Sequence, residues 1–184
     1  GRLIVVDDTV YAGTAIKNFR SKFLEDVYFA ATYVKPEAKD LVDFYAKELP
    51  PPHLLEWNLF NCTYIQQALL DFDGILSPNV PFDVCQDEEL YIDYIKNVKP
   101  FYHRIPTFGI VSARLERYRP VTEEWLSRHD IKYESLTMMP DSMEEERNKN
   151  HVEVSSTYKA EAFCKSDSKF FIESEISEAI RIRK

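Results

Sequence analysis

The sequence predicts an α/β protein built on parallel sheets, and three observations indicate this class. Short apolar runs rich in β-branched and aromatic residues alternate along the chain with amphipathic stretches, which is typical of strands followed by helices. Several of these runs end directly in acidic or hydroxyl residues, as strands do where open parallel sheets bind ligands. Hydrophobic residues make up 45% of the 184 residues, which is enough for a packed core.

The net charge, the cysteines and the lack of long apolar runs limit the partners and the compartment expected for this protein. The formal net charge is −8, which disfavours a nucleic-acid partner because such proteins normally carry a basic face. Cys62, Cys85 and Cys164 lie far apart, which predicts reduced thiols in the cytoplasm and no disulfide framework. No apolar run approaches the roughly 18 to 20 residues of a membrane span, so no membrane partner is expected.

The two ends of the sequence look cut. A core strand, Leu3–Val6, begins almost at the first residue, and the helix expected over 176–184 ends without a cap. We therefore expect the sequence to be part of a longer chain. Within it we expect two domains, over residues 1–62 and 63–184, without a Gly- or Ser-rich linker between them.

The first domain opens with a candidate ligand site. The strand Leu3–Val6 runs into the adjacent acids Asp7 and Asp8, and a loop with Gly13 then leads into a helix expected over 14–24. Free backbone N–H groups at the start of a helix favour phosphate. Adjacent acids can hydrogen-bond the two hydroxyls of a ribose. The simpler alternative is a strand and an acidic turn before a helix.

This stretch, with a strand expected over 27–34 and the pair Lys35-Pro36 after it, resembles the C-terminal half of xanthine-guanine type I phosphoribosyltransferases. The resemblance implies that Asp7 and Asp8 hold the ribose of phosphoribosyl pyrophosphate or of a nucleotide. It implies base-binding roles for Lys35 and Leu54. The implied phosphate loop consists of Thr9, Val10, Tyr11, Ala12, Gly13 and Thr14.

The phosphate loop departs from the family pattern at two positions. Family members commonly have Thr-Gly-x-Thr here, whereas this chain has Ala12 and Ala15 in place of the threonines. The backbone donors are kept, but two hydroxyl donors are missing. Each lost hydrogen bond to a charged group is worth about 1.5–3 kcal/mol, so weaker phosphate binding is expected.

The second domain contains a pair of carboxylates, Asp71 and Asp73, at the end of an apolar run and just before Gly74. Side chains alternate along a strand, so the two carboxylates share a face. Such a pair can hold Mg²⁺, which proteins bind through one or two carboxylates plus phosphate and water. One carboxylate can then act as nucleophile and the other as general acid and base. The alternative is a strand that ends in an Asp-Gly turn.

The order of the later motifs resembles the haloacid dehalogenase (HAD) superfamily of phosphatases. A strand expected from Thr107 ends at Ser112, Lys159 lies in a helix expected over 155–163, and a last strand ends in Glu173 and Glu175. The resemblance implies a HAD-like Rossmannoid parallel sheet after a partial phosphoribosyltransferase-type sheet. The gaps between these motifs are too short for a large cap domain, so a minimal cap is expected.

The resemblance also implies roles for these residues. Asp71 attacks phosphorus, and Asp73 protonates the leaving group and later activates water. Ser112 and Lys159 stabilise the transferring phosphoryl group, with Lys165 as the competing choice for the lysine. Arg114 is a phosphate contact because of its charge and planar donor geometry. The residues implied to hold Mg²⁺ are Asp71, Asp73, Glu173 and Glu175.

Together these motifs predict a phosphatase of nucleotides or related small phosphate esters, fused to a domain that binds phosphoribosyl pyrophosphate or a nucleotide. Two other functions stay open. The altered phosphate loop also fits a non-catalytic nucleotide-binding or scaffold module. The segment from Ser112 to Leu126 resembles HAD phosphatases that act on polynucleotide ends, although the net charge of −8 disfavours that substrate.

Overall fold

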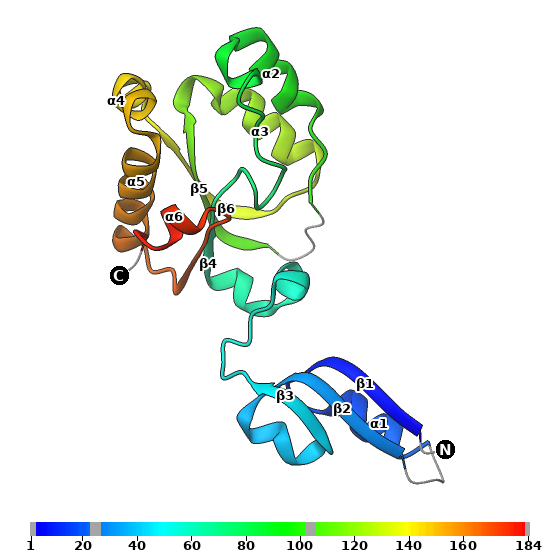
Figure 1. Ribbon diagram of the computed structural model, residues 1–184. Coiled ribbons are helices and arrows are strands. Elements are labelled where there is room, and N and C mark those ends of the chain that lie inside the picture. The colour runs from blue at the N-terminus through cyan, green and yellow to red at the C-terminus, as the bar shows by residue number, and fades with distance from the viewer. Residues whose placement is uncertain (1–2, 23–26, 102–105, 183–184) are drawn as a thin grey trace. The chain divides into compact units, whose positions relative to one another are not determined.

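The computed structural model describes residues 3–22, 27–101 and 106–182. The chain forms two compact units, Gly1–Glu56 (unit 1) and Trp57–Lys184 (unit 2), and each unit has its own parallel sheet (Figure 1). This is the α/β class that the sequence predicts. None of the helices in the described ranges is long and apolar enough to cross a membrane.

Unit 1 has a three-stranded sheet in the order β1-β2-β3, with both neighbouring pairs parallel. Phe29, Ala31 and Val34 of the middle strand pack against Ile16 and Ala38, which come from the two helical segments of the unit. The elements are β1 Leu3–Val10, α1 Thr14–Arg20, β2 Val27–Val34, the 3₁₀ helix η1 Pro36–Leu41 and β3 Phe44–Glu48.

The other face of this sheet carries apolar side chains that stay exposed. Val6 is paired with Ala30, and Ala30 with Phe44, so all three lie on one face of the sheet. Val6 is 72% exposed and Phe44 is 55% exposed, and Ile4, two residues before Val6, is 53% exposed. We call Ile4, Val6 and Phe44 the open apolar face.

Unit 2 has a four-stranded parallel sheet in the order β6-β5-β4-β7. Its strands are β4 Ala68–Leu70, β5 Thr107–Leu115, β6 Tyr133–Met139 and β7 Phe170–Ile172. Its α-helices are α2 Glu88–Asn97, α3 Arg119–Arg128, α4 Glu144–Lys149, α5 His151–Lys165 and α6 Ile176–Ala179. Its 3₁₀ helices are η2 Glu56–Asn61, η3 Thr63–Gln67, η4 Val84–Gln86, η5 Glu116–Tyr118 and η6 Asp141–Met143.

Helices cover both faces of the unit 2 sheet (Figure 1). Leu70 of β4 packs in one core cluster with Trp125 of α3. Its neighbour Leu69 points the other way and packs in a cluster with Phe163 of α5. Because both faces are covered, the central strands are apolar at consecutive positions, as parallel strands usually are.

Several elements differ from the sequence prediction in their ends. β1 runs on to Val10 because its pairing with β2 continues through Val10 and Val34, so Thr9 and Val10 are strand residues and not loop residues. The first helix ends at Arg20, and the expected positions 23–24 lie outside the described residues. α5 runs from His151 to Lys165 and is therefore longer at both ends than the helix expected over 155–163.

Candidate active site

Asp71 lies at the carboxyl edge of the unit 2 sheet. It directly follows β4, which has β5 on one side and β7 on the other. Its backbone N–H donates to the carbonyl oxygen of Ile172 at 3.0 Å, so the main chain is tied to β7 at this point. Its side chain is buried, and burial raises the pKa of Asp71 well above the ordinary carboxyl value, although the ammonium group of Lys159 opposes the shift.

Lys159 reaches Asp71 from α5. Its Nζ atom lies 3.0 Å from Asp71 Oδ2 and 2.6 Å from Glu173 Oε2, and all three side chains are buried. Burial alone lowers the pKa of Lys159, but the neighbouring carboxylates outweigh burial and raise it. Lys159 is therefore charged at neutral pH. The structure brings together these three residues from distant parts of the sequence, whereas Lys165 pairs with Glu161 at the surface.

A third carboxylate, Glu178 of α6, also contacts Lys159, with Oε2 at 2.8 Å from Nζ. The sequence analysis did not single out this residue. Its one distinguishing feature in the sequence is its place in the helical stretch after the acidic end of the last strand. Because the chain has 31 acidic residues, this feature was not enough to select it. Three carboxylates thus surround one ammonium group.

Asp73 is held by Arg114 in a two-pronged ion pair. Arg114 Nη2 lies 2.6 Å from Asp73 Oδ1, and Arg114 Nε lies 2.9 Å from Asp73 Oδ2. The guanidinium group also lies over the Phe72 ring, with 3.8 Å between Cζ and the ring centre. Burial lowers the pKa of Arg114, but the charge of Asp73 outweighs it and raises the pKa. Arg114 is a permanent, fixed cation at this site.

Ser112 lies on β5, two residues before Arg114. It is buried, and its Oγ atom accepts the backbone N–H of Arg114 at 3.1 Å. The pairing of β5 with β6 is irregular between Ser112 and Leu115, so the strand is distorted where it passes the site. Gly74 lets the turn after Asp73 pack closely, since it has φ +83° and an added Cβ would lie 2.1 Å from Ser174 Oγ.

The four carboxylates implied to hold Mg²⁺ do not group around one point. Both oxygens of Asp73 face Arg114, whereas Asp71 and Glu173 meet at Lys159. Glu173 Oε1 also accepts the backbone N–H groups of Ser174 and Glu175. Across the described ranges, no three or more His, Cys, Asp or Glu side chains form a group that could hold a metal ion. In this arrangement the residues do not fit the expected Mg²⁺ site.

Unit 1 contains a pocket of about 230 Å³ at the end of β1. Asp7 lines it and Asp8 is not among its lining residues, because adjacent strand residues point to opposite faces. Burial raises the pKa of Asp7, whose Oδ1 accepts the backbone N–H of Asp8 at 2.9 Å. The lining residues are Asp7, Thr9, Val10, Tyr11, Ala12, Gly13, Thr14, Ala15 and Ile16.

The two residues expected to bind a base lie outside the pocket lining. Lys35 Nζ lies 4.8 Å from the centre of the Tyr11 ring and 3.6 Å from Glu37 Oε2. Leu54 is half-buried. A residue that the sequence analysis missed, His53, is buried with its ring against Tyr11 and in contact with the Thr9 hydroxyl. Lys35 and His53 thus reach the pocket through Tyr11 and Thr9, which line it.

Comparison with known proteins adds no assignment to this geometry. No protein-family model, curated protein or solved structure matches the chain. The resemblances carried by the motifs therefore stay predictions. The function has to be argued from the side chains at the two sites.

Proposed function

We propose that unit 2 is a phosphoric monoester hydrolase of the HAD type that acts on a nucleotide or a related phosphate ester. The observation that carries the proposal is the buried pair of Asp71 and Lys159, 3.0 Å apart at the carboxyl edge of the central strand. Ligands of open parallel sheets bind at this edge. The order β6-β5-β4-β7 supports the proposal because β5, which contains Ser112, and β7, which ends just before Glu173, lie on either side of β4.

The proposed reaction has two steps. An Asp71 oxygen forms a bond to phosphorus as the bond from phosphorus to the ester oxygen breaks, and Asp73 gives the leaving oxygen a proton. Water then attacks phosphorus of the aspartyl-phosphate while Asp73 takes up a proton, which restores Asp71 and releases phosphate. Lys159, Arg114 and the Ser112 hydroxyl offset the negative charge on the phosphoryl oxygens.

Asp73 has to leave Arg114 before it can serve as the acid. Its side chain is 23% exposed, whereas that of Arg114 is 1% exposed and lies flat on Phe72. A phosphate group can accept the same two N–H donors of a guanidinium group that a carboxylate accepts. We infer that an incoming phosphate takes the place of Asp73 on Arg114. The freed Asp73 carboxylate then takes up a proton from solvent and turns toward the leaving group.

The test is hydrolysis of p-nitrophenyl phosphate by the full chain. Asp71→Asn should abolish turnover, because the amide is nearly isosteric with the carboxylate but cannot attack phosphorus. Asp130→Asn is the matched control, since Asp130 lies at the surface and its side chain is 83% exposed. Full turnover by the Asp71 variant would show that Asp71 is not the nucleophile.

Dependence on Mg²⁺ stays a prediction that the same assay tests. The described carboxylates do not fit the ion as they stand, so none of the proposed steps passes through it. Turnover should be compared with Mg²⁺ added and with EDTA. Comparison of a mononucleotide with an oligonucleotide 3′-phosphate then separates a nucleotide phosphatase from a polynucleotide-end phosphatase.

For unit 1 we propose binding of a ribose 5-phosphate group, as in a nucleotide or phosphoribosyl pyrophosphate. The support is the pocket of about 230 Å³, which combines the Asp7 carboxylate with the turn around Gly13. Ala12 and Ala15 offer the phosphate no hydroxyl groups, which favours weak binding over efficient transfer. Calorimetry with a nucleoside monophosphate and with phosphoribosyl pyrophosphate tests this binding. If neither ligand gives heat, the scaffold module is favoured.

A further inference from the structure

Lys159 makes three contacts, and the sequence predicts only two of the partners. Its Nζ atom lies 3.0 Å from Asp71 Oδ2, 2.6 Å from Glu173 Oε2 and 2.8 Å from Glu178 Oε2. A lysine ammonium group has three N–H donors and no acceptor. The three carboxylates can therefore take every donor of Lys159, and together they fix the direction in which each donor points.

Glu178 reaches Lys159 from α6, a short helix that lies beside α5 in Figure 1. Its backbone N–H donates to the carbonyl oxygen of Glu175 at 3.0 Å, which anchors the main chain just past the end of β7. The residue is only 3% exposed. Its second carboxylate oxygen faces Nδ1 of His151 at 3.8 Å, on the side nearer to solvent.

The burial of this carboxylate is not explained by stability. Asp71 and Glu173 already offer two negative charges to the single charge of Lys159, and Glu178 adds a third. A buried charge is costly to remove from water, and replacing buried ion pairs by apolar residues is often neutral or stabilising. Glu178 instead fixes the orientation of the ammonium group, because it accepts from the N–H donor of Lys159 that Asp71 and Glu173 do not use.

We propose that Glu178 is a positioning residue that holds the ammonium group of Lys159 against Asp71. Its effect on catalysis rests on the proposed phosphatase function, whereas its effect on Lys159 does not. Without the Glu178 carboxylate, one N–H donor of Lys159 loses its acceptor and the amine turns away from Asp71. The side chain then becomes easier to modify, and it no longer meets the phosphoryl group at a fixed angle.

The first experiment measures the reactivity of Lys159 in the full chain. Reductive methylation at one fixed pH, followed by mass spectrometry of the peptide that contains Lys159, gives a rate for this amine. In Glu178→Gln, a nearly isosteric change, the amide oxygen can still accept a hydrogen bond but carries no charge, so the bond to Lys159 weakens and the rate should rise by roughly tenfold. Glu178→Asp keeps the charge on a shorter side chain and should give an intermediate rate.

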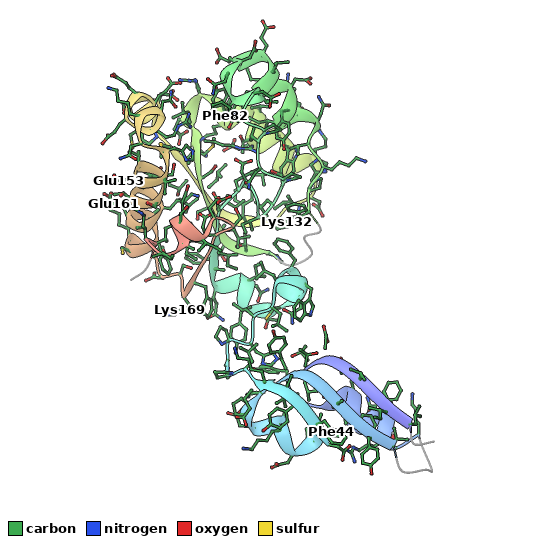
Figure 2. All side chains as sticks on the ribbon, in the orientation of Figure 1. Phe44, Phe82, Lys132, Glu153, Glu161 and Lys169 are labelled. Atoms are coloured by element: carbon green, nitrogen blue, oxygen red, sulfur yellow. The ribbon has the colours of Figure 1, made fainter. Side chains whose placement is uncertain are left out.

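Two controls accompany this measurement. Glu161→Gln removes a carboxylate from α5, the helix that carries Lys159. Because Glu161 lies at the surface of α5 (Figure 2), this change should leave the methylation rate of Lys159 unaltered. Lys165, whose side chain is 77% exposed, is an internal reference for the amount of reagent, and its methylation rate should be equal in the wild type and in the two Glu178 variants. Equal Lys159 rates in the wild type and in Glu178→Gln would overturn the proposal.

The second experiment is the hydrolysis of p-nitrophenyl phosphate by the same variants. Glu178→Gln should lower kcat by roughly 10- to 100-fold, the cost of a small misplacement of a catalytic group, with a smaller change in KM. An unchanged kcat in an active enzyme would overturn the positioning role. If the wild type hydrolyses no phosphate ester, the proposed function fails, and the methylation rates alone decide whether Glu178 holds Lys159.

Discussion

The two units differ in how far the charged side chains of their candidate sites are buried and paired. In unit 2, Asp71, Lys159 and Arg114 are buried, and each has a partner of opposite charge within hydrogen-bonding distance. In unit 1, Lys35 makes a longer contact with the exposed Glu37, and Asp7 is only half-buried. The charged side chains of the candidate site in unit 2 are thus held by their partners, whereas those of the candidate site in unit 1 are more open to solvent.

The difference follows from how each sheet is covered. Helices pack on both faces of the unit 2 sheet, so polar groups at its edge are removed from water and have to be paired. The described part of unit 1 has a core on one face only, and its polar groups stay close to solvent. Fixed dipoles and charges in a dry site favour catalysis, because they need no reorganisation during the reaction.

The largest expected effect is on stability, when the lysine of each candidate site is replaced. Lys159→Met leaves three buried carboxylates without their cation and should lower the free energy of unfolding by about 3–5 kcal/mol. Lys35→Met removes a longer ion pair whose Glu37 side chain is 69% exposed, and should cost at most about 1 kcal/mol. Urea unfolding followed by circular dichroism measures both. Similar losses in the two variants would show that burial does not distinguish the sites.

The next effect compares a glycine from each unit. Gly74 has φ +83°, and a Cβ there would lie 2.1 Å from Ser174 Oγ and 2.7 Å from Ser174 Cβ. Gly13 has φ +69°, but its nearest neighbour is the end of the Leu41 side chain, which can move. Gly74→Ala should therefore cost about 2–3 kcal/mol and Gly13→Ala about 1 kcal/mol. Thermal melting that ranks them in reverse would contradict this reading of the two turns.

A third prediction concerns pH. Because the pKa of Asp71 is raised in the folded state, the native protein binds more protons than the unfolded chain at any pH between the two pKa values. Asp71 therefore makes stability fall as pH rises from about 4, the ordinary carboxyl value, through its raised value. Asp71→Asn should remove this slope and raise the free energy of unfolding at pH 7.

Urea unfolding of the wild type and Asp71→Asn between pH 4 and 8 measures this slope. Asp130→Asn is again the matched surface control. The combination of lost turnover with gained stability would indicate that Asp71 is kept for function at the expense of stability. A variant that is less stable than the wild type at every pH would show that the contact with Lys159 outweighs the burial of Asp71.

The smallest expected effect is in the open site of unit 1. Ala12→Thr with Ala15→Thr adds two hydroxyl donors to the pocket and should tighten binding of a nucleoside monophosphate by roughly tenfold, the value of one good hydrogen bond to a charged group. Calorimetry measures the change. If the double variant binds no more tightly than the wild type, the pocket does not hold phosphate at this turn.

Part of this organisation could be predicted from sequence. Apolar runs located most of the strands, although not β3. The carboxyl ends of parallel strands share an edge, so Asp71, Ser112 and Glu173 were expected together. Lys159 was found through the order of the motifs. Its neighbour Glu178 was not, because the choice among 31 acidic residues depends on how α6 packs beside α5.

Side-chain direction was the other part that the sequence did not determine. Asp71 and Asp73 were expected to act as a pair, yet Asp71 turns to Lys159 and Asp73 to Arg114. Which cation each one meets depends on distances between strands and helices that no local pattern encodes. For the same reason, that Asp8 lies inside β1 became clear only from the full extent of the strand.

The open apolar face of unit 1 has a practical consequence for following the protein in solution. Environment-sensitive dyes that fluoresce on apolar surfaces should bind Ile4, Val6 and Phe44 in the native state, so their signal starts high before heating. The two tryptophans, Trp57 and Trp125, both belong to unit 2. Their intrinsic emission therefore reports the melting of unit 2 without any label on the chain.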